Sequence, residues 1–322
     1  MPDLVTIGEI RSAAARLEGV TLRTPLLPYQ GASQPLLLKP ESLQPTGSFK
    51  LRGAHAAISA VPASERSRGV IAHSSGNHGL AVAYAAAALG VPATVVVPST
   101  APAVKVAAAQ ARGARIVRCE PGIAAREAAT RELADRHGYT LIPPFDDRRV
   151  IAGQGTVGLE IATDCPEADL IVCPVSGGGL IAGIAAALTA LRPGAKVVGV
   201  EPELAADARD SLRQRRRVAW AASDTERTIA DALRVNQVGE LPLQHLISQV
   251  HAIVTVTDDQ IRAAMRALAT TARLVAEPGG AAAVAACLFL PDQLPAARTT
   301  VAVLSGGNVD PALLASVLSG SE

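Results

Sequence analysis

The sequence predicts an α/β protein with two open parallel-sheet domains, each with helices on both faces and the smaller inserted in the larger. Two stretches of alternating strand-like and helix-like segments indicate the two sheets, and their short connections are typical of parallel strands. The crossover connections should be right-handed. The first sixty or so residues have no sheet partners of their own, so we expect them to join the second sheet.

The smaller domain is predicted over residues 69–147. Residues 79–104 carry no charge and are long enough for a membrane span, but Gly90, Val91 and Pro92 divide them into a helix and a strand of a buried α/β unit. Apolar and β-branched runs alternate with Ala-rich or charged stretches, which predicts strands at 70–75, 93–98, 115–120 and 139–145 and helices at 77–89, 102–112 and 122–137.

The larger domain is predicted to combine residues 1–68 with 148–322. Asp3 and Glu9 interrupt the apolar pattern at the N-terminus, which favours an amphipathic helix there over a signal peptide. Further along, the pattern predicts strands at 169–175, 196–202, 252–258 and 299–305 and helices at 155–164, 180–191, 258–272 and 278–289.

Composition narrows the class of protein. Hydrophobic residues make up 49% of the 322 residues and aromatic residues only 2%, which predicts an aliphatic, helix-rich core. A net charge of +1 argues against nucleic acid or a membrane as the main partner and favours a small molecule. The basic run 213–217 is interpreted as a solvated face. Four scattered cysteines without a CxxC pair predict reduced thiols in a cytoplasmic protein.

Several predicted strands end in turns rich in glycine, serine and asparagine, where open parallel sheets bind ligands. In HSSGNHGLA, the side chains of Ser74, Ser75, Asn77 and His78 lie beside the amides that begin a helix, a setting that suits a substrate carboxylate. Helix capping is the alternative, but capping alone does not require six consecutive small or polar residues.

The next two turns suggest a phosphate and a ring. PVSGGGLIAG, residues 174–183, has three successive glycines whose amides can approach an anion at a helix N-terminus, which predicts a phosphate cradle. A tight turn rarely needs three glycines. LSGGNVD, residues 304–310, places Ser305 at a third strand end, as a helix cap or as the partner of a ring nitrogen.

Lys50 follows Thr-Gly-Ser-Phe and precedes Arg-Gly. A lysine, a phosphate cradle and a hydroxyl at a third strand end together predict pyridoxal phosphate, whose aldehyde forms a Schiff base with lysine. A nicotinamide oxidoreductase is the alternative, because residues 177–183 form a loose dinucleotide fingerprint and Glu201 ends the next strand. That alternative leaves Lys50 unexplained, as does a binding module without catalysis.

The segments SLQPTGSFKLRGA, HSSGNHG, PVSGGGLIAGIA and LSGGNVD resemble the fold-type II pyridoxal-phosphate enzymes, which have a tryptophan-synthase-β-like fold, and within them the serine/threonine dehydratase and serine racemase family. VIAGQGT, TIADAL and EPGGA resemble further family segments, in the expected order between residues 39 and 310. The resemblance implies a homodimer. It also implies no C-terminal regulatory domain, because few residues follow Asp310.

The resemblance implies a role for each site residue. Lys50 would be the Schiff-base lysine and general base, Phe49 would pack on the cofactor ring, and Asn77 would bind the 3-hydroxyl of the ring. Ser305 would face the pyridine nitrogen. The phosphate would be held by Ser176, Gly177, Gly178, Gly179 and Leu180, and the substrate by Ser74, Ser75, Asn77 and His78.

The implied activity is α,β-elimination of water from L-serine or L-threonine, giving a 2-oxo acid and ammonia. A neutral hydroxyl at Ser305 would favour elimination over transamination. Ser75, on the ring face opposite the lysine in family members, keeps serine racemase and 3-hydroxyaspartate dehydratase open; its alternative role is a small residue in a tight turn. Arg126 could meet a second carboxylate, although a surface position is the simpler interpretation.

Racemase-like members hold a divalent cation with a Glu, a carbonyl four residues on and an Asp two further. Glu201, the Ala205 carbonyl and Asp207 match that spacing and predict Mg²⁺ or Ca²⁺; the alternative is a solvated acidic loop. Two departures bear on the substrate. Leu80 replaces the usual Gln of dehydratases, which keeps a β-replacement enzyme open, and Ala232 replaces a glycine beside the cofactor.

Overall fold

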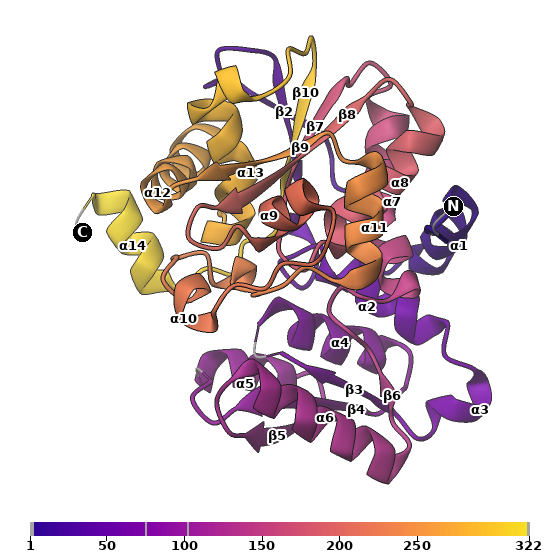
Figure 1. Ribbon diagram of the computed structural model, residues 1–322. Helices are drawn as coiled ribbons and strands as arrows, with labels where there is room; N and C mark the ends of the chain where they lie inside the picture. The colour runs from indigo at the N-terminus through magenta and orange to yellow at the C-terminus, as the bar shows by residue number, and fades with distance from the viewer. Residues whose placement is uncertain (1–2, 75, 102, 321–322) are drawn as a thin grey trace.

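The computed structural model describes residues 3–74, 76–101 and 103–320 and confirms the predicted fold class. Figure 1 shows a six-stranded sheet above a smaller four-stranded sheet. In the larger sheet the order is β1 (Leu27–Tyr29), β2 (Leu36–Pro40), β10 (Thr300–Leu304), β7 (Leu170–Pro174), β8 (Lys196–Pro202) and β9 (Ala252–Val256). In the smaller sheet it is β5 (Arg115–Cys119), β4 (Ala93–Pro98), β3 (Val70–His73) and β6 (Thr140–Leu141).

Neighbouring strands in both sheets run parallel, except that β1 pairs with β2 in the antiparallel direction. Helices cover both faces of each sheet (Figure 1). The α-helices are α1 (Ile7–Leu17), α2 (Lys50–Ser59), α3 (Ala63–Arg66), α4 (Asn77–Ala88), α5 (Ala103–Gln110), α6 (Ile123–His137), α7 (Arg148–Asp164), α8 (Gly179–Leu191), α9 (Asp207–Gln214), α10 (Ala222–Thr225), α11 (Glu240–Gln249), α12 (Asp258–Ala267), α13 (Pro278–Phe289) and α14 (Pro311–Ser319).

The N-terminal segment joins the larger sheet, as expected, because β2 pairs with β10 from Leu36↔Thr300 onward. Helix α2 packs differently. Its residues Leu51 and Ile58 belong to the same hydrophobic cluster as Val95 of β4. The helix that begins with Lys50 therefore packs against α4 of the smaller domain as well as against α7, although its sequence precedes residue 69. The domain boundaries at 68/69 and 147/148 stay a prediction.

Three elements differ from the prediction. Helix α7 begins at Arg148, not at 155, because the Asp147 carboxylate caps it by accepting from the Arg149 and Val150 amides. Strand β6 spans two residues instead of seven, since the prolines at 143 and 144 offer no amide to a ladder. The helix predicted at 258–272 ends in a π-helical turn from Leu268 to Ala272.

The core is aliphatic, as the composition predicts, and Ala, Val, Ile and Leu dominate its buried side chains. Strands β7 and β10 are buried along their whole length, which is typical of central parallel strands covered on both faces. Within the described ranges, no helix has the length and apolar character needed to cross a membrane.

Candidate active site

The glycine-rich turn between β7 and α8 is the segment that was predicted to hold a phosphate. Gly178 has φ +87°, a left-handed conformation that favours glycine. A side chain at Gly177 would overlap the Phe145 ring, and one at Gly179 would lie 3.0 Å from Phe145 atoms. The Ser176 hydroxyl is buried and has no hydrogen-bond partner in the described part of the chain. This turn therefore places a buried, unpartnered hydroxyl at a helix N-terminus, and Phe145 packs against two of its glycines.

Lys50 lies at the first turn of α2, and its Nζ donates to the Pro144 carbonyl at 2.8 Å. Burial lowers the pKa of Lys50 to about 8, and the charge of Glu277 partly opposes that shift. The Phe49 amide donates to the Ser305 carbonyl at 3.0 Å, which ties the lysine turn to the end of β10. Because Phe145 follows Pro144, the lysine also lies near the glycine turn.

The turn after β3 contains Ser74, Asn77 and His78; Ser75 lies outside the described residues. The Ser74 hydroxyl accepts from the Gly76 amide at 3.1 Å. Gly76 precedes the first residue of α4 and has no side chain to cap it, so the first amides of α4 can serve an anion. The local structure therefore suits the predicted carboxylate site.

His78 is buried, and its Nε2 lies 2.8 Å from the Ile142 carbonyl. Burial, together with the charge of Lys50, lowers its pKa to about 3, so the imidazole is neutral. A carbonyl partner requires the proton on Nε2, which leaves Nδ1 without one. The ring cannot then donate to a carboxylate, and the predicted substrate contact would have to come from the His78 amide.

Arg126 on α6 lies beside His73 at the end of β3. Burial lowers the pKa of His73, and the nearby charge of Arg126 lowers it further. The Arg126 Nε is buried and has no hydrogen-bond partner among the described residues. Arg126 is partly exposed, but its Nε is an unused buried donor, and its charge acts on both His73 and Cys119.

Glu201 and Asp207 lie close together at the start of α9. The Glu201 carboxylate is fully buried and accepts from the Ala208 and Arg209 amides at 3.1 and 2.8 Å. Burial and the Asp207 charge raise its pKa well above the usual range. In this position Glu201 is not available to a ribose, which removes the carboxylate required by the nicotinamide alternative.

Asp207 makes the pair electrostatically unusual. Burial raises its pKa to about 7, although the Val238 backbone acts in the other direction. Neither carboxylate oxygen has a hydrogen-bond partner of normal geometry among the described residues. Ala205 is also buried. Among those residues, no group of three or more His, Cys, Asp or Glu side chains converges, but the predicted site needs only two carboxylates and one carbonyl.

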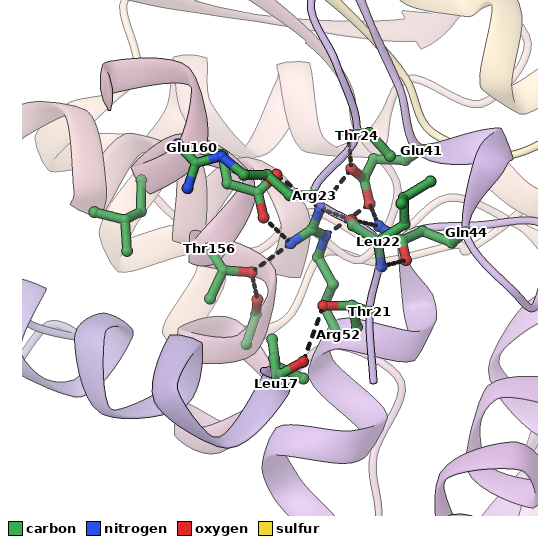
Figure 2. A network of polar contacts seen from close by, with 12 residues as sticks. Leu17, Thr21, Leu22, Arg23, Thr24, Glu41, Gln44, Arg52, Thr156 and Glu160 are labelled. Atoms are coloured by element: carbon green, nitrogen blue, oxygen red, sulfur yellow. Dashed lines mark hydrogen bonds and ion pairs between the residues drawn. The ribbon is translucent and has the colours of Figure 1, made fainter. Parts of the chain in front are cut away.

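Figure 2 shows a buried network of polar contacts around Arg52. Arg52, two residues after Lys50, donates from Nε and Nη2 to Glu41 at 2.7 and 2.8 Å. Its Nη1 donates to Glu160 at 2.6 Å and to Thr156 at 3.1 Å. The network joins α2 to α7 and to the 3₁₀ turn that follows β2, and so fixes the direction of the helix that begins with Lys50.

Glu277 and Asn308 were missed as site residues. Asn77 Nδ2 donates to Glu277 at 2.6 Å, and Asn308 Nδ2 donates to Asn77 Oδ1 at 2.7 Å. Both residues lie in quoted segments, EPGGA and LSGGNVD, which was the available signal. Two residues depart from the family pattern. Leu80 is partly buried on α4. Ala232 is exposed, and its Cβ lies 3.2 Å from the position that a Cβ at Gly279 would take.

Comparison with known proteins gives consistent matches. Residues 17–306 match the family model described as "Pyridoxal-phosphate dependent enzyme". The L-threo-3-hydroxyaspartate ammonia-lyase of Saccharomyces cerevisiae is 39% identical over 321 residues, which covers 98% of this chain and 97% of that protein. The L-threonine ammonia-lyase of Thermotoga maritima is 39% identical and covers 95% and 76%. The structure of maize serine racemase matches with a TM-score of 0.92 and 34% identity, and covers 98% and 97%.

Proposed function

Because the chain belongs to the family of pyridoxal-phosphate-dependent enzymes, we propose that it is a hydroxy-amino-acid ammonia-lyase acting on L-serine or L-threonine. The products are a 2-oxo acid and ammonia. The observation that carries the proposal is Lys50, an amine with a pKa of about 8 held at a helix start beside the glycine turn. An ordinary surface lysine has a pKa of about 10.4, so at pH 8 it is charged and cannot act as a base.

The residues present fit pyridoxal phosphate. The hydroxyls of Thr46, Ser48 and Ser176 are buried and have no hydrogen-bond partner within the described ranges. A buried hydroxyl without a partner costs about 1–3 kcal/mol, so a bound group that fills these positions offsets an existing cost. The phosphate would be held by the turn from Ser176 to Leu180, and the ring would lie between Phe49, Asn77 and Ser305.

The proposed reaction uses the cofactor ring, the amine of Lys50 and the turn at the start of α4. The cofactor supplies an electron-accepting ring that stabilises negative charge at the substrate Cα. The neutral amine of Lys50 removes the Cα proton, and the resulting ammonium can return that proton to the substrate β-hydroxyl, which leaves as water. The amides at the start of α4, with Ser74 and Asn77, hold the substrate carboxylate. The uncharged Ser305 hydroxyl leaves the ring less electron-deficient than a carboxylate partner would, which favours elimination.

The test is chiral amino-acid and 2-oxo-acid analysis of the purified protein with L-serine, L-threonine and the 3-hydroxyaspartates. Oxo acid without the opposite enantiomer supports the ammonia-lyase. The opposite enantiomer in quantity would replace it by a racemase, with Ser75 as the residue on the second face; Ser75→Ala would then stop racemisation. Neither product from any substrate would reject both and favour β-replacement, to which Leu80 points.

A specific observation favours 3-hydroxyaspartate as a second candidate substrate: Arg126 has an unused buried donor, and its charge acts on His73, which precedes Ser74. We expect Arg126→Ala to reduce kcat/KM for 3-hydroxyaspartate roughly 10- to 100-fold, the range for one charge-assisted hydrogen bond, and to change that for L-threonine far less. Arg131→Ala, at an exposed position on the same helix, is the matched control. Equal losses on both substrates would remove Arg126 from the specificity site.

Glu201, the Ala205 carbonyl and Asp207 form the proposed Mg²⁺ or Ca²⁺ site. A cation would stabilise two buried carboxylates that are otherwise held together at an electrostatic cost. Because the pKa of Asp207 is raised to about 7, protons compete with the cation below that pH. We expect cation affinity, measured by calorimetry after EDTA treatment, to fall as the pH drops from 8 to 6. Asp207→Asn should abolish binding; unchanged binding would reject the site.

We also propose that the chain forms homodimers in the cytoplasm. The dimer follows from the family resemblance, and light scattering of the purified protein tests it. The cytoplasmic location rests on thiols that suit a reducing compartment: Cys119, Cys165, Cys173 and Cys287 are all free. Fractionation of cells that express the tagged full chain would reveal any other location.

A further inference from the structure

Asn77 is held from both sides by residues of the larger sheet domain. It is the first residue of α4, in the smaller domain. Glu277 immediately precedes α13, and Asn308 follows β10. The Asn77 amide donates from Nδ2 to Glu277 and accepts at Oδ1 from Asn308. We call Asn77, Glu277 and Asn308 the Asn77 clamp.

The polarity of the clamp is determined by Asn308. A carboxamide nitrogen carries two hydrogens, and Asn308 Nδ2 donates them to the Thr46 carbonyl at 2.8 Å and to Asn77 Oδ1. Asn77 Oδ1 must therefore face Asn308, and Asn77 Nδ2 must face the Glu277 carboxylate. One hydrogen of Asn77 Nδ2 remains to donate to a bound group.

Glu277 and Asn308, the two clamp residues that contact Asn77, pack closely against backbone. The Glu277 amide donates to the Gly306 carbonyl at 3.1 Å, and a side chain at Gly306 would overlap the Glu277 carboxylate. A side chain at Gly47 would likewise overlap the Asn308 amide. Glu277 and Asn308 therefore lie directly against glycine backbone, at Gly306 beside Ser305 and at Gly47 three residues before Lys50.

Glu277 also interacts electrostatically with Lys50. The Glu277 side chain is only 4% exposed, and its charge raises the pKa of Lys50. The other titratable group that faces Lys50 is His78, which is neutral. A buried carboxylate requires a compensating cation or several donors; Asn77 donates to Glu277, and the charge of Lys50 acts on it. Glu277 thus contacts the residue that orients the ring and acts electrostatically on the base.

We propose that Glu277 is a positioning residue that fixes the Asn77 amide across the domain boundary and serves as the counter-ion of Lys50. The inference rests on the proposed function only in assigning Lys50 and Asn77 to the same site. Asn308 is the second positioning residue, which acts on Asn77 but carries no charge. The two residues should therefore affect different measurable properties.

The first experiment measures how the charge of Glu277 affects the pKa of Lys50. The cofactor is removed from the full chain, and the rate at which acetic anhydride acylates Lys50 is followed against pH by peptide mass spectrometry, with exposed Lys196 as internal reference. Glu277→Gln can still accept from Asn77 but has no charge, so the pKa of Lys50 should fall and acylation at pH 7 should rise at least about three-fold. Glu277→Asp, which keeps the charge, should give a smaller change. Identical pH profiles for wild type and Glu277→Gln would overturn the counter-ion role.

The second experiment measures the clamp in the holoenzyme. Asn308→Ala should leave the pH profile of Lys50 acylation unchanged and raise KM for the hydroxy amino acid about ten-fold or more, because Asn77 loses its fixed orientation. Asn308→Gln and circular dichroism separate this effect from misfolding. Wild-type KM in Asn308→Ala would overturn the clamp. Since acylation needs no turnover, absence of ammonia-lyase activity would reject the proposed function without deciding the first experiment.

Discussion

Lys50→Ala is expected to lower ammonia-lyase turnover by at least about 10³-fold, because in the proposed function Lys50 is both the general base and the covalent attachment point of the cofactor. The wild-type amine is suited to this work because burial lowers its pKa to about 8. Borohydride reduction followed by intact-mass analysis should add the mass of one cofactor to the wild-type chain and none to the variant. Turnover is measured as 2-oxo acid formed from L-threonine.

Lys196→Ala is the matched control, since Lys196 is an exposed lysine at the start of β8. It should retain wild-type turnover and the mass gain. The Lys50 substitution should not unfold the chain, because the lost ammonium was partly desolvated and made one backbone hydrogen bond, to Pro144. Residual turnover of Lys50→Ala above about one tenth of wild type would mean that another group is the base.

The fold could be predicted largely because strand and helix periods are local properties. Strand β4 was predicted to the residue, and β3 ends only two residues early. The failures occur where tertiary packing overrides local pattern. Helix α7 was predicted to begin at 155, yet it begins at Arg148 and contains Gly153 and Gly155, where neighbouring backbone and side chains leave no room for a Cβ.

In the candidate site, too, residues in local motifs could be predicted, whereas contacts made only in the folded chain could not. Ser176 and Ser305 could be proposed from sequence because they lie in short motifs at strand ends, and Lys50 could be proposed because it lies in the Thr-Gly-Ser-Phe-Lys motif. Glu277 could not be assigned a role, since its partner Asn77 is 200 residues away and only the folded chain brings them together. The unusual character of Asp207 was equally hidden, because it arises from burial next to Glu201.

The buried Arg52 network shows a further consequence of long-range packing. Arg52 and Glu41 are almost completely buried, at 1% and 0% side-chain exposure. Burial alone would raise the pKa of Glu41, but the charge and hydrogen bonds of Arg52 hold it below its usual value. Lys39 joins through Glu160, with which it forms an ion pair at 2.6 Å. The carboxylates therefore depend on this arginine to remain buried and charged.

Arg52→Ala should consequently lower the free energy of unfolding by about 3–5 kcal/mol, because it leaves a buried carboxylate without its partner. Urea denaturation followed by circular dichroism measures the change. Arg23→Ala is the matched control: its ion pair with Asp164 lies at the surface, where such pairs contribute about 0–1 kcal/mol. If both variants lost the same small amount, the network would not stabilise the helix that begins with Lys50. Arg52→Lys, which keeps the charge but not the bidentate contact with Glu41, should lose an intermediate amount, because a single ammonium cannot reach Glu41, Glu160 and Thr156 together.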